Sequence, residues 1–131
     1  MRATLALTLL LSCLTGILSQ QQKLDSAVAK TLVSGCMKEN GVTYQDIEDL
    51  QSGKVKPQDA KDNVKCSTQC ILVKSGFMDS TGKLLTDNIK THYANTNLSD
   101  AVEKDLERCS QVKGANACDT AFQIVGCFEG A

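Results

Sequence analysis

The chain has 131 residues, which is enough for one compact domain and too few for two. Its 14 basic and 15 acidic side chains give a net charge of −1 and form no basic patch, so composition argues against a nucleic-acid partner. One proline and no tryptophan fit a helical protein.

The first 19 residues have the features of a secretory leader. Arg2 precedes an apolar run over residues 3–11, and Ser19 is a small residue suited to signal-peptidase cleavage. The apolar run is too short to be read as a membrane span. We therefore expect a signal peptide over residues 1–19 and a single secreted domain over residues 20–131, in a compartment where disulfides persist.

Apolar residues at helical spacing, each run followed by a glycine, predict the first two helices. The first covers about residues 26–40 and stops at Gly41. The second follows Thr43, a plausible N-cap with Asp46 three residues later, and ends near Gly53.

Four further helices are predicted in the rest of the chain. Pro57 is expected to open a third helix, Gly114 to stop the fifth and Asn116 to cap the sixth. These helices are predicted over residues 58–75, 85–94, 99–113 and 117–128. No run alternates in the manner of a strand, so the predicted fold class is all-α, a compact bundle of about six short helices.

Six cysteines remain after removal of the leader, which contains Cys13, and an even number of cysteines in a secreted chain indicates three disulfides. Cys66 and Cys70 are four residues apart and share one helix face, so bridges from them to different neighbours would tie three helices together. Cys118 and Cys127 would be about 13 Å apart in one helix, too far to pair directly. These constraints leave several pairings open.

The spacing of the six cysteines, with 29, 3, 38, 8 and 8 residues between successive ones, resembles that of the insect odorant-binding proteins. The resemblance covers essentially the whole mature chain, and the sequence agrees locally around residues 35–42, 65–70, 74–79 and 118–122. It implies three interlocked bridges around an apolar cavity. The implied pairs are Cys36–Cys70, Cys66–Cys118 and Cys109–Cys127.

Three bridges would also affect how the interior must pack. In the chain-entropy model each closed loop stabilises the fold by about 3 to 4.5 kcal/mol. Three such contributions are comparable to the whole net stability of a small domain. The interior can therefore remain partly hollow, as a carrier requires.

The candidate ligand-binding residues are apolar positions expected to face this cavity, and for each one the alternative is an ordinary core role. Binding would come from burial of apolar ligand surface, with a hydroxyl of Tyr93, Thr91 or Tyr44 fixing one polar group. The candidates are Ile47, Leu72, Phe77, Met78, Leu85, Ile89, Tyr93, Val102, Leu106, Phe122, Val125 and Phe128.

Two further residues have more than one interpretation. His92, the only histidine, is a candidate pH sensor, but a solvated helix position explains it more simply. Asn97 begins the glycosylation sequon Asn97-Leu98-Ser99, although its place before the fifth helix favours helix capping by Asn97 or Ser99.

The resemblance implies a monomeric or weakly dimeric carrier that binds a small hydrophobic ligand in aqueous lymph and delivers it towards membrane odorant receptors, without a cofactor. The same scaffold in saliva, venom or a defensive secretion is the alternative, because fold does not dictate function. A hydrolase would have to use His92 as its base, with no evident nucleophile beside it. A metal site at Cys66 and Cys70 is disfavoured by the leader and by the lack of nearby histidines.

Overall fold

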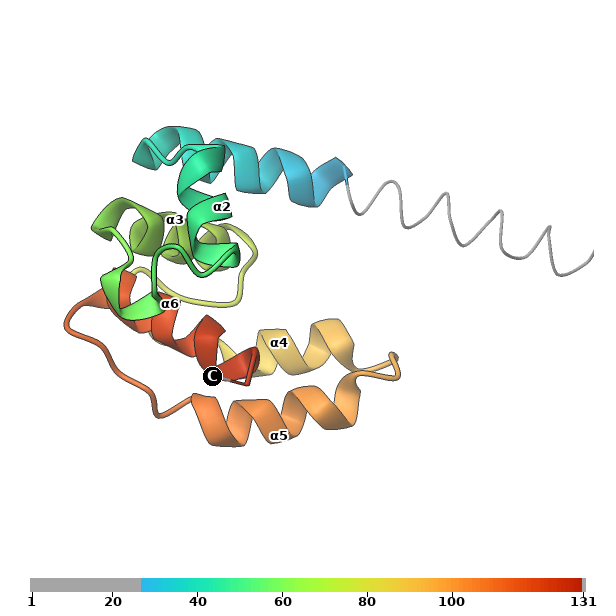
Figure 1. Ribbon diagram of the computed structural model, residues 1–131. Helices are drawn as coiled ribbons and strands as arrows, with labels where there is room; N and C mark the ends of the chain where they lie inside the picture. Colours follow the sequence, from blue (N-terminus) through green and yellow to red (C-terminus); the bar gives the residue numbers. More distant parts are fainter. Residues whose placement is uncertain (1–26, 131) are drawn as a thin grey trace, which may run out of the picture. The chain divides into compact units, whose positions relative to one another are not determined.

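The computed structural model describes residues 27–130, so the predicted leader over residues 1–19 lies outside the described residues. The described part of the chain is helical and contains no strand beyond one isolated bridge. This confirms the predicted all-α class, and no described helix is long and apolar enough to span a membrane. A first helix covers residues 27–40 and is followed by α2 (Tyr44–Gln51), η1 (Pro57–Asp59), α3 (Asp62–Lys74), α4 (Thr86–Tyr93), α5 (Ser99–Cys109) and α6 (Ala117–Phe128) (Figure 1).

The described residues divide into two units, one that ends at Leu32 and one that begins at Val33. In the first unit, residues 27–32 are helical, and the hydroxyl of Thr31 donates to the carbonyl of Ala27 at 3.0 Å. The second unit contains every element from α2 onward, and the rest of the description concerns this unit.

The N-terminus of α2 has the predicted capping box. The Thr43 hydroxyl accepts a hydrogen bond from the Asp46 backbone N–H at 3.1 Å, and the Asp46 carboxylate accepts one from the Thr43 N–H at 3.0 Å. Gly41 has a φ of +65°, a conformation that favours glycine, and it ends the preceding helix as predicted. Both signals are local, which is why the sequence reveals them.

The predicted helix over residues 58–75 is wrong at its start. Pro57 opens only the 3-10 turn η1, and the backbone at Ala60 is extended, with φ −60° and ψ 139°. Turns of the 3-10 type seldom exceed three or four residues. Because the side chain of Ala60 is buried, the chain steps inward there, and α3 begins only at Asp62.

The predicted helix over residues 99–113 is too long, because α5 ends at Cys109. The segment that follows is held by side chains of α6, with the Gly114 N–H donating to the Thr120 hydroxyl at 2.9 Å and the Ala115 N–H to the Asp119 carboxylate at 2.8 Å. A Cβ atom at Gly114 would lie 2.3 Å from an Asp119 carboxylate oxygen. Glycine is therefore needed here for a close approach, not as a helix stop.

The helices of the second unit pack around α6, which contacts α3 and α5, while α4 and α5 lie side by side (Figure 1). Two hydrophobic clusters fill the contacts between them. The larger one contains the buried residues Met78, Leu84, Ile89, Leu106, Ala121 and Ile124. The smaller one contains the buried residues Met37, Val42 and Val64.

Three disulfides link these helices, and their pairs are the ones that the resemblance implies. They are Cys36–Cys70, Cys66–Cys118 and Cys109–Cys127, with Cα–Cα distances of 5.7, 4.4 and 5.8 Å. They close loops of 34, 52 and 18 residues, for which the chain-entropy model gives a stabilisation of about 3 to 4 kcal/mol each. Because every cysteine in the described residues is oxidised, Cys66 and Cys70 are not free to bind a metal as thiolates.

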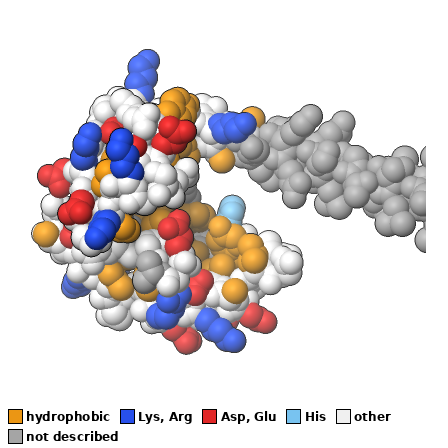
Figure 2. Space-filling model, in the orientation of Figure 1, with side chains coloured by type: hydrophobic (Ala, Val, Ile, Leu, Met, Phe, Trp, Pro, Cys, Tyr) orange, Lys and Arg blue, Asp and Glu red, His pale blue; other side chains and the backbone are white. Residues whose placement is uncertain are grey.

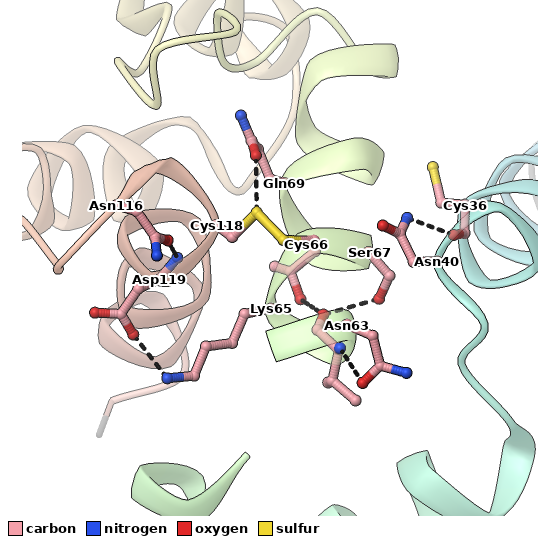
Figure 3. The surroundings of a disulfide bond; sticks show 12 residues. Cys36, Asn40, Asn63, Lys65, Cys66, Ser67, Gln69, Asn116, Cys118 and Asp119 are labelled. Atoms are coloured by element: carbon pink, nitrogen blue, oxygen red, sulfur yellow. Dashed lines mark hydrogen bonds and ion pairs between the residues drawn. A yellow bond between two sulfur atoms is a disulfide. The ribbon is translucent and has the colours of Figure 1, made fainter. Parts of the chain in front are cut away.

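The bridge between Cys66 and Cys118 is covered by the side chain of Gln69 (Figure 3). The Gln69 amide oxygen lies 3.2 Å from the Cys118 sulfur, which is a contact and not a hydrogen bond, because a disulfide sulfur has no proton to donate. The amide nitrogen of Gln69 donates to the carbonyl of Ser80 at 3.1 Å.

One partly buried ion pair lies beside this bridge. The Lys65 ammonium is 3.0 Å from the Asp119 carboxylate, and Asn116 caps α6 by accepting a hydrogen bond from the Asp119 N–H at 2.9 Å (Figure 3). The hydrogen bond from the Ala115 N–H, followed by the one from Lys65, holds the pKa of Asp119 below its ordinary value of 3.8. The carboxylate thus fastens both the start of α6 and the loop before it.

We predict that this carboxylate makes stability depend on pH. Because the pKa of Asp119 is lower in the folded chain than in the unfolded chain, its stabilisation is present above pH 3.8 and is lost as pH falls through the folded-state pKa. The free energy of unfolding of Asp119→Asn, measured with urea at several pH values, should lie below that of the parent chain at pH 6 and approach it in acid.

Lys65→Gln serves as the partial variant in this experiment. It leaves the Ala115 N–H in place, so it should remove only part of the pH-dependent difference. A difference between the Asp119→Asn variant and the parent that stays constant from pH 6 to pH 2 would contradict this account.

Candidate functional site

An apolar cleft of about 280 Å³ opens in the second unit. Figure 2 shows hydrophobic side chains gathered in a hollow of the molecule. The volume is near the lower limit for small-molecule sites, so the cleft suits one small ligand. It is lined by Leu72, Phe77, Leu84, Ile89, Tyr93, Val102, Ile124, Val125 and Phe128.

The inner faces of three helices form most of this lining. Ile89 and Tyr93 lie one turn apart on α4, Val102 faces them from α5, and α6 adds residues 124, 125 and 128. The Cys109–Cys127 bridge joins α5 to α6 at the end of α6 that carries Phe128. A covalent link therefore fixes two walls of the cleft next to each other.

Leu72 of α3 and the turn between α3 and α4 supply the remaining wall. The Phe77 carbonyl accepts a hydrogen bond from the Leu85 N–H at 2.8 Å, and Met78 and Leu84 form an isolated antiparallel bridge. This pairing turns the chain back on itself, so that Phe77 and Leu84 both reach the cleft.

Polar groups of Asp79 tighten the tip of this turn. Its carboxylate accepts hydrogen bonds from the Thr81 hydroxyl at 2.6 Å and from the N–H groups of Thr81 and Lys83 at 2.9 and 3.0 Å. The Thr81 hydroxyl and then the Lys83 N–H lower the pKa of the Asp79 carboxyl. Gly82 has a φ of +91°, and a Cβ there would lie 3.1 Å from the Cα of Ala117, so glycine also lets the turn approach α6.

Three rings cluster at one side of the cleft. His92 packs edge-on against Phe77 and Tyr93, with ring centroids 5.3 and 4.8 Å apart. His92 is exposed, as expected for a solvated helix position, but its ring also contacts the cleft wall. Tyr93 is the one residue of the lining whose side chain carries a polar atom, so its hydroxyl is the candidate polar partner for a ligand.

Seven of the twelve candidate ligand-binding residues lie in this lining. They are Leu72, Phe77, Ile89, Tyr93, Val102, Val125 and Phe128. The structure brings them together from four helices and a turn, as a shared cavity requires.

The other five candidates lie elsewhere. Met78 and Leu106 are 1% and 3% exposed and belong to the core beside the cleft. Ile47 and Phe122 pack against the smaller hydrophobic cluster. Leu85 is the residue before α4, with φ −91° and ψ 75°, and it is not part of the lining.

Sequence reasoning missed two lining residues, Leu84 and Ile124. Leu85 is a candidate because it continues the spacing of Ile89 and Tyr93, but α4 begins only at Thr86 and this spacing does not extend before it. Ile124 is absent from the candidates, although its spacing of four from Phe128 indicates that both face the same side.

Three larger hollows are lined by more polar groups. One, of about 640 Å³, borders Lys65 and Asp119, and another, of about 800 Å³, includes Lys83 and Lys113. The third, of about 430 Å³, includes Glu39 and Lys74. An apolar ligand would leave such groups without water, so the 280 Å³ cleft is the better candidate for a hydrophobic ligand.

Comparison with known proteins gives one consistent result. The PBP/GOBP family pattern matches residues 19–131. General odorant-binding protein 56a of Drosophila melanogaster is 29% identical over 115 residues, which cover 86% of this chain and 76% of that protein.

Solved structures agree with this match. A medfly odorant-binding protein is 31% identical, with a TM-score of 0.65 over 78% of this chain and 85% of the other. Odorant-binding protein 7 from Anopheles gambiae, solved with an azo compound, is 25% identical, with a TM-score of 0.66 over 79% of this chain and 82% of the other. The matched proteins are named as odorant-binding proteins, and none of these names describes an enzyme.

We predict that Leu84 and Leu85 contribute differently to stability, because only Leu84 lies in the cleft wall. Leu84 is buried and in the larger hydrophobic cluster, so Leu84→Ala should lower the free energy of unfolding by about 2 kcal/mol or more. Leu85 is only half-buried, so Leu85→Ala should cost about 1 kcal/mol. Urea unfolding of the two variants tests the order, and equal losses would contradict it.

Proposed function

The chain belongs to the PBP/GOBP family of insect odorant-binding proteins, and from this membership we propose that it reversibly binds small odorant or pheromone molecules and transports them through aqueous lymph. The mechanism is binding and release without a chemical step. The single observation that carries this proposal is the apolar cleft enclosed by α3, α4, α5, α6 and the turn before α4.

Burial of apolar ligand surface supplies the binding free energy. Each buried methylene group contributes about 0.8 kcal/mol. Eight of the nine lining side chains are wholly apolar, and the ninth is Tyr93. A ligand in the cleft therefore gains mainly from its hydrocarbon part, and its polar end is oriented by one hydroxyl.

This lining favours an uncharged ligand with one polar group, such as an alcohol, aldehyde or ester. No lining residue carries a positive charge. Lys90, the lysine on α4, lies instead in a separate hollow with Glu103 and Glu107 of α5. A carboxylate buried in the cleft would lack a cationic partner, which is costly in an apolar site.

We also propose that the chain is processed in the secretory pathway. Residues 1–19 would be removed as a signal peptide, and residues 20–131 would form the secreted odorant-binding domain. The mature chain would act in sensillum lymph as a monomer or weak homodimer and deliver its ligand towards membrane odorant receptors.

A second candidate function uses the same cleft outside olfaction. A general carrier or scavenger of hydrophobic molecules in saliva, venom or another secretion requires the same apolar lining. Its ligands would differ, whereas the binding residues would be the same.

We predict that affinity follows the hydrocarbon length of the ligand. In a series of straight-chain primary alcohols, each added methylene should strengthen binding about fourfold until the cleft is full, because 0.8 kcal/mol corresponds to this factor. Displacement of a hydrophobic fluorescent probe from the oxidised protein measures the series. A carboxylic acid of equal length, ionised at pH 7, should bind more weakly.

Two tryptophan variants locate the binding site. Val125→Trp places a large ring in the cleft and should weaken alcohol binding at least tenfold. Val73→Trp makes the same change at an exposed position on α3 outside the lining and should leave affinity unchanged. Equal affinities in the two variants, or no displacement by any neutral ligand, would contradict the proposal.

A further inference from the structure

The turn between α4 and α5 contains a sequence feature that ligand binding does not explain. Asn97-Leu98-Ser99 is the only Asn-x-Ser/Thr sequon in the 131 residues. Such a sequon is an acceptor for an N-linked oligosaccharide in a secreted protein. The sequence alone favours a competing role, in which Asn97 or Ser99 caps the fifth helix.

The structure contradicts the capping role. The residue at the N-cap position of α5 is Leu98, and no side chain there forms a capping hydrogen bond. The Leu98 and Ser99 N–H groups instead donate to the hydroxyl and the carbonyl of Thr96, each at 3.3 Å. Helix formation therefore does not occupy the Asn97 amide.

Asn97 is also accessible. It is exposed in the turn, and its side chain makes no hydrogen bond among the described residues. Its neighbour Leu98 is 52% exposed, so the surface around the amide is open to solvent. Residues 94–98 contribute nothing to the lining of the cleft, although Tyr93 and Val102 on either side of the turn do.

We propose that Asn97 carries an N-linked oligosaccharide. In this modification the Asn97 amide nitrogen bonds to the anomeric carbon of an oligosaccharide attached to a lipid diphosphate. The bond between that carbon and the diphosphate oxygen breaks, the diphosphate leaves, and the amide nitrogen loses one proton. Ser99 supplies the hydroxyl that the sequon requires.

Because Asn97 lies in the turn between α4 and α5, a glycan there would have a specific effect on the protein surface. The glycan would be attached outside the cleft lining and beside an exposed leucine. It would therefore add a hydrophilic cover at the end of the α4–α5 pair and leave ligand affinity unchanged. Glycosylation is thus separate from ligand binding, and either can fail without the other.

The experiment uses the full chain, with its leader, expressed in insect cells. Intact mass is measured for protein from both cells and medium, before and after treatment with peptide N-glycosidase. The parent chain should lose the mass of one glycan, and the enzyme should leave aspartate at position 97. Ser99→Thr should retain the glycan, because threonine preserves the sequon.

Matched variants assign the site. Asn97→Gln and Ser99→Ala should both abolish the glycan. Asn95→Gln alters another exposed asparagine of the same turn without touching the sequon and should retain the modification. A parent chain whose mass equals that expected from its sequence in both fractions would overturn the proposal, as would a glycan that persists in Asn97→Gln.

Discussion

Cys66 and Cys70 of α3 lie only four residues apart, and each forms a disulfide with a different neighbouring segment. The packing of the second unit depends on this arrangement. Cys70 holds the helical residues 33–40 through Cys36, while Cys66 holds α6 through Cys118. A helix is stiff over this distance, so the two bridges fix both neighbours to one rigid element. Their contribution of about 3 to 4 kcal/mol each is large against the net stability of a small domain.

This covalent frame explains how so small a core can border an open apolar cleft. The larger cluster has six buried residues, and several of its partly buried neighbours face the cleft. In a chain stabilised by packing alone, such exposed apolar surface would lower stability directly. Here the third bridge, Cys109–Cys127, fixes α5 to α6 beside the lining, so the walls need not collapse on each other.

Sequence patterns that act within a few residues predicted much of this fold. Contacts between residues far apart in the sequence were not predicted. The capping residues Thr43 and Asn116 act within three residues, so their sequence patterns were sufficient. Gly114 was interpreted as a helix stop, because the Asp119 carboxylate that requires its small size becomes visible only in three dimensions. Leu84 entered the cleft wall through pairing across a turn, which helical periodicity does not describe. The disulfide pairing was predicted correctly because the cysteine spacing resembles that of a known family. The spacing alone left several pairings open.

The most direct test of this account is to observe where a ligand chain lies in the oxidised protein. A ¹³C-labelled neutral alcohol bound to the protein should show intermolecular nuclear Overhauser effects to the methyl groups of Val102, Ile124 and Val125, which come from two helices of the cleft wall. Effects confined to exposed methyl groups, such as those of Val73 or Leu98, would place the ligand outside the cleft and contradict the account.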